Sequence, residues 1–336
     1  MKNKIIIIAE IGVNHNGSIL NAKKLIDLAK RAGADYVKFQ SYKSNNLVCE
    51  DLNISNYQLR NIKKRITQFD LLKKYELTEN QHKEIIRYSK KKKIHFLSSP
   101  FDTDSLSLLY RLNIFDIKIP SGEINNYILL KKIAQRAKKI FLSTGMSKIN
   151  EIGQAIKILI NNGALKKNIT VLHCHSDYPT NLSDVNLLAM LTIASRFKVK
   201  IGYSDHTLGK ETGIAAVALG AQVLEKHITL SKNMRGPDHN ASMNPKEFID
   251  YVSSIRKTEN LLGSYIKKPS KSEILNKRFA RKSIVAKVNI KKGELFSEAN
   301  IISKRPEGGV SPLLWNDFIN KKAKKNFLKD QFIFLK

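Results

Sequence analysis

The feature that most constrains this chain is a repeated alternation between a short apolar segment and a segment with helical spacing. The first apolar segment, Ile5 to Ile8, is a run of β-branched residues typical of a strand buried on both faces. Ala22, Leu25, Ile26 and Ala29 then recur at helical spacing. Further predicted strands follow at residues 34–40, 94–98, 115–119, 139–142, 169–174, 199–203 and 222–224. Eight such units in about 260 residues predict a (β/α)8 barrel, a TIM barrel, rather than an open doubly wound sheet.

Polar residues lie at or just after the end of each predicted strand. In a (β/α)8 barrel these ends share one face, where active sites form. A single polar strand end is usually a turn, but a continuous series predicts a site. The series consists of Glu10, Lys38, Gln40, Ser99, Lys118, Glu123, Ser143, Tyr178, Ser204, His206 and His227.

Two of these residues, His206 and His227, close consecutive strands on either side of one helix-like run, Thr212 to Leu219. Parallel strands joined by a helix end at the same edge, so the two imidazoles are expected to converge. Carboxylates at Asp205, Glu225 and Asp238 lie nearby in the sequence. The group predicts a divalent-metal site without a cysteine ligand, for which Mn²⁺ or Mg²⁺ suits as well as Zn²⁺.

The remaining polar residues at the ends of the predicted strands suit an anionic ligand. Lys38 and Lys118 are cations at strand ends, and the hydroxyls of Ser121, Ser143 and Ser204 lie beside glycines or turns, so that together they suit a phosphate and a carboxylate. Glu10 follows an apolar strand that is expected to raise its pKa, which suits a group that moves a proton or holds a water. These residues alone indicate a metal-assisted lyase or aldol-type enzyme acting on a phosphorylated acid.

The chain is predicted to form a barrel domain over residues 1–263, a linker over 264–279 and a small domain over 280–336. Its formal charge is +30, largely from lysines on expected solvent-facing helix positions. Aromatic residues are not interleaved with these lysines, so we expect a solvated surface and no nucleic-acid partner. No segment approaches the length of a membrane helix, and two cysteines form no disulfide framework, so a cytoplasmic protein without a membrane partner is expected.

The motifs together resemble the sialic acid synthase (N-acetylneuraminate synthase) family, which includes legionaminic acid synthases. The resemblance runs nearly end to end, and its C-terminal part is similar to the antifreeze-like (SAF, β-clip) domain of that family. The matching strings are AEIGVNHNGS (9–18), VKFQS (37–41), SSPFD (98–102), KIPSGE (118–123), STGM (143–146), YSDHT (203–207), EKHITL (225–230), GPDH (236–239), KKGE (291–294) and KRP (304–306).

The resemblance implies condensation of phosphoenolpyruvate with an N-acetylmannosamine-type sugar, with release of phosphate. It implies that His206 and His227 bind the metal, that Glu10 manages the attacking water, and that Arg305 reaches the sugar in the partner's barrel within a domain-swapped homodimer. The implied phosphoenolpyruvate contacts are Lys38, Lys118, Ser99, Ser121, Ser143 and Ser204. The implied sugar contacts are Gln40, Glu123, Tyr178 and Asp238.

Several alternatives stay open at this stage. The main reading is an N-acetylneuraminate synthase using N-acetylmannosamine, and the alternative is a legionaminic acid synthase using 2,4-diacetamido-2,4,6-trideoxymannose. Another phosphoenolpyruvate-dependent sugar-acid synthase and a non-catalytic basic binding protein are the remaining readings. Ser176 stands where some family members carry an asparagine that contacts phosphate, and Asn14 to Asn16 suit a structural turn and a functional loop equally. The segment Cys49 to Asp70 shows no clear period.

Overall fold

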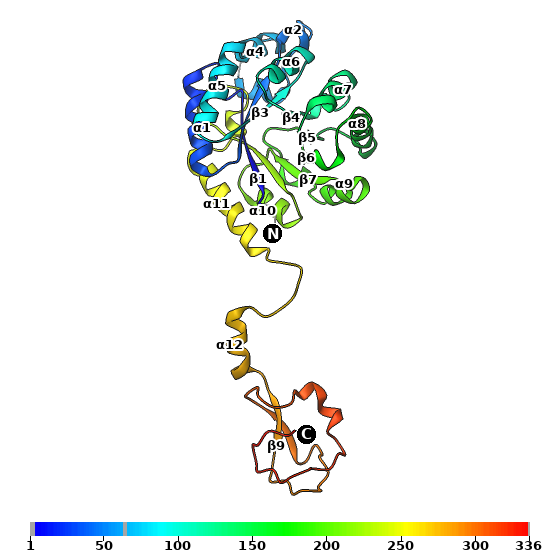
Figure 1. Ribbon diagram of the computed structural model, residues 1–336. Coiled ribbons are helices and arrows are strands. Elements are labelled where there is room, and N and C mark those ends of the chain that lie inside the picture. Colours follow the sequence, from blue (N-terminus) through cyan, green and yellow to red (C-terminus); the bar gives the residue numbers. More distant parts are fainter. Residues whose placement is uncertain (1–3, 63–65, 335–336) are drawn as a thin grey trace. The chain divides into compact units, whose positions relative to one another are not determined.

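The computed structural model describes residues 4–62 and 66–334 of the chain. It divides into two compact units, Met1–Gly263 and Ser264–Lys336. The first unit is a closed barrel in which eight parallel strands follow one another in chain order, with helices around them (Figure 1). The predicted (β/α)8 barrel is therefore confirmed. The strands are β1 (Ile6–Gly12), β2 (Tyr36–Ser41), β3 (His95–Pro100), β4 (Asp116–Ile119), β5 (Lys139–Ser143), β6 (Ile169–Cys174), β7 (Lys200–Asp205) and β8 (Val223–His227).

The helices of the barrel unit alternate with these strands, and several begin at a residue suited to the role. Thr78 and Asn244 cap α5 and α11 with reciprocal side-chain bonds to Gln81 and Glu247, as their spacing in the sequence indicates. None of the helices in the described part of the chain is long and apolar enough to cross a membrane. The helices are α1 (Ile19–Ala32), α2 (Ser44–Leu47), α3 (Asn56–Ile62), α4 (Gln68–Tyr75), α5 (Glu79–Lys91), α6 (Thr103–Arg111), α7 (Tyr127–Arg136), α8 (Ile149–Asn161), α9 (Ala189–Phe197), α10 (Glu211–Ala218) and α11 (Pro245–Leu261), with short 3₁₀ turns η1 (Ser121–Glu123), η2 (Lys166–Asn168), η3 (Leu182–Asp184) and η4 (His239–Ala241).

A small apolar cluster, distinct from the larger core shared with the helices, is contributed by six strands. We call it the plug: Ile8, Tyr36, Leu97, Phe141, Leu172 and Val223. Side chains alternate between the two faces of a strand, so the residue two positions after each plug member shares its face. These residues, one step nearer the C-terminal end, are Glu10, Lys38, Ser99, Ser143, Cys174 and Glu225. The polar site is therefore built directly above an apolar plug.

Two regions differ from the sequence-based expectation. Strand β1 continues to Gly12, so Glu10 lies within the strand instead of in the turn after it. The segment without a clear period contains α3 and the start of α4, and together with Ile54 and Ile66 these helices pack an apolar cluster against Val13. Each helix contributes only one or two apolar residues to that cluster, too few for a recognisable period.

The second unit has its own small core, which includes Phe296, Phe318 and Phe327. Strands β9 (Ser283–Ala286) and β10 (Ile301–Lys304) pair antiparallel, and a 3₁₀ helix, η5 (Pro312–Asp317), follows. The residues predicted as a linker carry most of a capped helix, α12 (Lys271–Ala280). The small domain predicted over residues 280–336 includes residues 335 and 336, which lie outside the described residues.

Candidate active site at the C-terminal face of the barrel

Four buried charged side chains meet inside the barrel above the plug. The Lys38 ammonium lies 2.9 Å from Glu10 Oε2 and 3.6 Å from Glu225 Oε1. The Lys118 ammonium lies 3.4 Å from the same Glu225 oxygen. All four side chains are at most 5% exposed. These residues come from β1, β2, β4 and β8, and we call them the charge cluster.

The two carboxylates of the charge cluster differ in their protonation behaviour. Burial raises the pKa of Glu10 to about 7; Lys38 opposes this rise and the charge of Glu225 adds to it. Burial also raises the pKa of Glu225, but Lys118 and Lys38 outweigh it and the net pKa is lowered. Glu10 is therefore the group of this pair that can exchange a proton near neutral pH.

The two lysines differ in the same way. Burial lowers the pKa of Lys38, but Glu10 and Glu225 together reverse this and the net pKa is raised. For Lys118, burial again lowers the pKa, and Glu225 offsets it only in part, so the net pKa is lowered. Lys118 is thus the less fully paired cation.

The two predicted histidines converge, with ring centroids 5.4 Å apart. The Tyr178 ring packs against both, at 4.1 Å from His206 and 5.6 Å from His227. His206 Nδ1 lies 2.6 Å from the carbonyl oxygen of His175, which can only accept, so Nδ1 carries the proton and Nε2 keeps its lone pair. Burial lowers the pKa of His206 to about 4 and that of His227 well below its ordinary value, so both rings are neutral.

These histidines fit a divalent cation as a two-nitrogen donor set. Both supply neutral imidazole, and the buried His227 Nδ1 has no hydrogen-bond partner among the described residues. Residues 4–62 and 66–334 hold no group of three or more histidine, cysteine, aspartate or glutamate side chains arranged around one metal position. The remaining ligands would therefore come from substrate and water.

The predicted serines surround the charge cluster. Ser99 Oγ accepts a bond of 3.2 Å from Lys38, and Ser204 Oγ donates one of 3.0 Å to Glu225. The buried Ser143 hydroxyl has no partner in the described part of the chain. Ser121 Oγ accepts from the Gly145 backbone N–H at 2.9 Å and lies 3.1 Å from Cys174 Sγ. The serines thus line neighbouring strand ends from β3 to β7.

The residues of the barrel unit that are predicted to contact a sugar lie at the same end of the barrel, whereas Arg305 belongs to the second unit. Gln40 is half-buried at the end of β2, and Glu123 accepts a 2.7 Å bond from Asn126. Burial raises the pKa of Asp238 to about 6, and Lys38 acts in the opposite direction. Arg305 is exposed and follows β10 in the second unit.

Comparison with known proteins decides the family. The NeuB family matches residues 25–267 and the SAF domain matches residues 281–336. The chain belongs to the NeuB family. It is 49% identical to N,N'-diacetyllegionaminic acid synthase of Campylobacter jejuni, over 98% of this chain and 99% of that one. The namesake enzyme of Legionella pneumophila is 40% identical, over 95% and 90% of the two chains.

A solved structure supports the same assignment. The N-acetylneuraminic acid synthetase of Leptospira borgpetersenii aligns with a TM-score of 0.72 and 33% identity, covering 82% of this chain and 90% of that chain. The resemblance read from the motifs is confirmed. The chain is a member of a family of sugar-acid synthases, with a TIM barrel and a SAF domain.

For this NeuB-family member, the sequence placed Glu225 only near the predicted metal site, not with the lysines, and gave Cys174 no place in the site. Both lie two residues beyond a plug member. The alternation of side chains along a strand could therefore have placed them at the site. Ser176 also belongs to the neighbourhood, because a side chain added at Gly145 would collide with the Ser176 hydroxyl. Asn14 donates to the Ile228 carbonyl and to Ser242 Oγ, which ties the loop after β1 to the loop after β8 and gives Asn14 a structural role.

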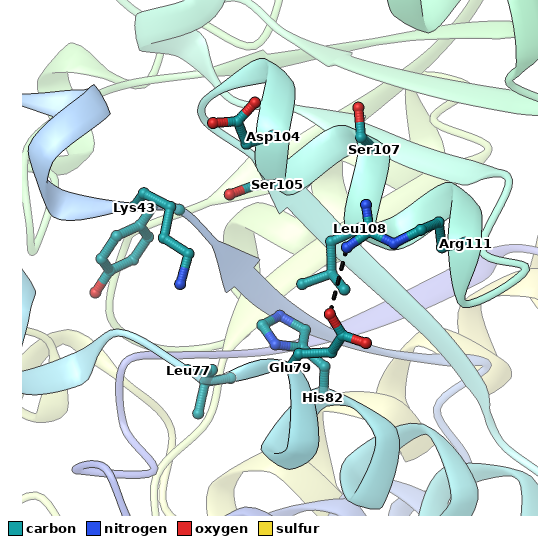
Figure 2. Close-up of a pocket in the computed structure, with 10 residues that line it drawn as sticks. Lys43, Leu77, Glu79, His82, Asp104, Ser105, Ser107, Leu108 and Arg111 are labelled. Atoms are coloured by element: carbon teal, nitrogen blue, oxygen red, sulfur yellow. Dashed lines mark hydrogen bonds and ion pairs between the residues drawn. The ribbon is translucent and has the colours of Figure 1, made fainter.

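A cavity of about 260 Å³ opens beside the barrel mouth and contains none of the predicted site residues (Figure 2). Its charged groups are paired with protein side chains: Arg111 lies 3.3 Å from Glu79, and Lys43 lies 3.0 Å from Glu76. The His82 ring on its wall is bonded to Ser41 Oγ at 2.8 Å and to the Thr78 carbonyl. We assign no ligand to this cavity.

Proposed function

We propose that this protein is an N,N'-diacetyllegionaminic acid synthase, which condenses phosphoenolpyruvate with 2,4-diacetamido-2,4,6-trideoxymannose and water and releases phosphate. The observation that carries the chemistry is the pairing of two buried lysines with two buried carboxylates beside two neutral histidines. The sugar is inferred from the higher identity to two legionaminic acid synthases, at 49% and 40%, than to the sialic acid synthetase, at 33%. This favours the alternative over the initial reading of an N-acetylneuraminate synthase.

Binding of phosphoenolpyruvate is assigned to the anion-binding side of the site. Lys38 and Lys118 supply positive charge for the phosphate and carboxylate groups. The hydroxyls of the surrounding serines supply hydrogen bonds, and that of Ser143 has no competing partner within the described residues. The serines in question are Ser99, Ser121, Ser143 and Ser204.

The sugar is assigned to the histidine side. A divalent cation, Mn²⁺ or Mg²⁺, held by His206 and His227 would polarise the aldehyde oxygen of the open-chain sugar. Tyr178 packs against both rings and limits their movement. Gln40, Glu123 and Asp238 are assigned to the sugar's polar groups, since all three lie at this end of the barrel.

The proposed bond changes use these assigned groups. C3 of phosphoenolpyruvate forms a bond to the sugar aldehyde carbon; the π-electron pair of the aldehyde moves to its oxygen, which takes up a proton and becomes a hydroxyl. Water adds at C2. Glu10, as the carboxylate, accepts a proton from that water, in keeping with its pKa of about 7. The C2–O bond to phosphate then breaks as the new C2 hydroxyl loses its proton and becomes a keto group, and phosphate leaves with the electron pair of the broken bond.

We further propose a homodimer in which Arg305 of one copy contacts the sugar in the other copy. This rests on the match of the KRP string to the family's C-terminal motif and on the exposure of Arg305 in its own unit. Light scattering of the full chain tests the dimer, and a monomer at assay concentration would contradict it.

Product identification by mass spectrometry tests the proposed reaction. The protein is incubated with phosphoenolpyruvate, Mn²⁺ and an equal mixture of N-acetylmannosamine and the diacetamido sugar. We expect phosphate release with the diacetamido product in excess. An excess of N-acetylneuraminate would favour the initial hypothesis. In a separate incubation, phosphate release only with N-acetylmannosamine 6-phosphate would indicate another sugar-acid synthase. No phosphate release with any of these sugars would favour a non-catalytic binding protein.

A further inference from the structure

A buried ion pair lies directly beside the two histidines, on the other face of their strands. Asp205 and Lys226 are register partners on β7 and β8, and their charged groups are 2.8 Å apart. Their side chains are 0% and 1% exposed. Asp205 precedes His206 in the chain, and Lys226 precedes His227. Strand alternation points Ser204 and Glu225 into the barrel and this pair outward, away from the charge cluster.

The ion pair is continuous with the turn that carries His206. Asp205 Oδ1 accepts from the Thr207 backbone N–H at 2.9 Å and from its hydroxyl at 2.7 Å. Lys226 donates to the Thr207 carbonyl oxygen at 2.6 Å. His206 therefore lies between Asp205 and Thr207, and both of these residues are bonded to Lys226. Lys226, which directly precedes His227, thereby joins the turn that carries His206 to strand β8.

The outward face of the pair is closed by helix α11. The Lys226 ammonium lies 5.7 Å from the centroid of the Tyr251 ring, and Tyr251 is fully buried. No substrate can reach the pair from that side. Its function must therefore act through the residues to which it is bonded.

The energetics argue that stability alone does not explain this pair. Removing two charges from water is costly, and a buried ion pair is often no more stabilising than a well-packed apolar pair of similar size. The hydrogen bonds of the ion pair are directional, and they fix the ends of β7 and β8 relative to each other. Neighbours that orient a metal-binding histidine typically change metal affinity ten- to hundredfold when they are replaced.

We propose that Asp205 and Lys226 are positioning residues that hold His206 and His227 at the separation needed for a divalent cation. This inference rests on the proposed function, because it takes the two histidines as the cation's protein ligands. It gives both residues a role in cation affinity and turnover that is separable from their effect on folding.

The test compares Lys226→Met with the double variant Asp205→Asn/Lys226→Met, in the full-length protein. The single variant leaves a buried carboxylate unpaired and should lower the unfolding temperature. The double variant removes that charge and should recover most of the lost stability. Mn²⁺ binding is followed by electron paramagnetic resonance of the free ion, and steady-state kinetics gives kcat and the KM for phosphoenolpyruvate.

The matched control is Arg256→Met. Arg256 lies 2.9 Å from Asp35, which precedes β2 at the opposite end of the barrel. We expect it to lower stability without changing the dissociation constant for Mn²⁺. Both Lys226 variants should bind Mn²⁺ at least about tenfold more weakly, with a fall in kcat and little change in the KM for phosphoenolpyruvate.

Recovery of wild-type Mn²⁺ affinity together with stability in the double variant would overturn the inference, because the pair would then be purely structural. The same holds for Lys226 variants that match Arg256→Met in Mn²⁺ affinity. A wild-type protein that neither binds Mn²⁺ nor releases phosphate would instead refute the proposed function, and the inference with it.

Discussion

Replacement of Glu225 by glutamine tests whether the charge cluster behaves as one electrostatic unit. The substitution preserves the size of the side chain, and the glutamine oxygen can still accept the bond from Ser204. Only the negative charge is lost. The charge of Glu225 contributes to the raised pKa of Glu10, so its removal should lower the pKa of Glu10 from its value of about 7.

The size of the effect follows from the geometry. Glu10 and Glu225 both contact the Lys38 ammonium, at 2.9 and 3.6 Å, so the contacting carboxylate oxygens lie no more than about 6.5 Å apart. At an effective dielectric constant of about 20, two charges at that distance interact by on the order of 2.5 kcal/mol. Such a difference corresponds to roughly 70-fold in the proton affinity of Glu10.

The sign for stability follows from the same pKa. Glu10 has a pKa in the folded protein above its ordinary value of 4.5, so its protonated form favours folding. This contribution is complete below pH 4.5 and is lost as the pH rises through about 7. In Glu225→Gln the loss should still begin near pH 4.5 but end at lower pH, and its total size should be smaller.

Two measurements check the prediction. The rate of phosphate release should rise with pH through about 7 in the wild type, as Glu10 loses its proton, and at lower pH in Glu225→Gln. The free energy of unfolding between pH 5 and 7 should fall more in the wild type than in the variant. Glu259→Gln, which removes a carboxylate bonded to Ile5 N–H before β1, should keep the wild-type profiles. A midpoint that stays in place or moves to higher pH in Glu225→Gln would refute the electrostatic coupling.

Three further substitutions address separate parts of the site. His227→Ala should abolish phosphate release while circular dichroism still shows a folded protein; loss of the fold would instead indicate a structural histidine. Gly145→Ala places a methyl group against the Ser176 hydroxyl and 2.9 Å from Ser121 Oγ, so steady-state kinetics should show a KM for phosphoenolpyruvate raised about tenfold or more. Arg305→Ala should raise the KM of the sugar more than that of phosphoenolpyruvate, and the reverse order would contradict its assignment.

Much of the barrel and part of the site follow from local sequence patterns. A lysine in an otherwise apolar strand, as at Lys38 and Lys118, is costly to bury without a partner. Such a lysine can therefore be recognised from the sequence as a candidate site residue. Their carboxylate partner cannot be recognised in this way, because Glu225 on β8 contacts lysines on β2 and β4 across the barrel interior. Strand order predicts which neighbours pair in the sheet, but contacts between non-adjacent strands depend on side-chain length and on the filling of the plug.

Helices α3 and α4 were missed for a related reason. Their register is set by the cluster that they form with Val13, in another part of the chain. Leu71 and Tyr75 are four residues apart, but two apolar positions do not distinguish a helix from a loop. Where a segment is stabilised by tertiary contacts more than by its own periodicity, the local sequence carries too little signal.

The unequal pairing of Lys38 and Lys118 in the charge cluster indicates where an anionic group of the substrate would bind most favourably. Lys38 is paired with both carboxylates, and its pKa is raised; among the described residues Lys118 is paired with Glu225 alone, and its pKa is lowered. An added anion therefore relieves the unfavourable burial of Lys118 more than that of Lys38. Ser121 lies just beyond Lys118 in the chain, and the hydroxyl of Ser143, which has no hydrogen-bond partner among the described residues, lies at the end of the next strand. We therefore expect the phosphate group to lie on the β4–β5 side of the barrel, which leaves Lys38 beside Glu10, where the water is to be deprotonated.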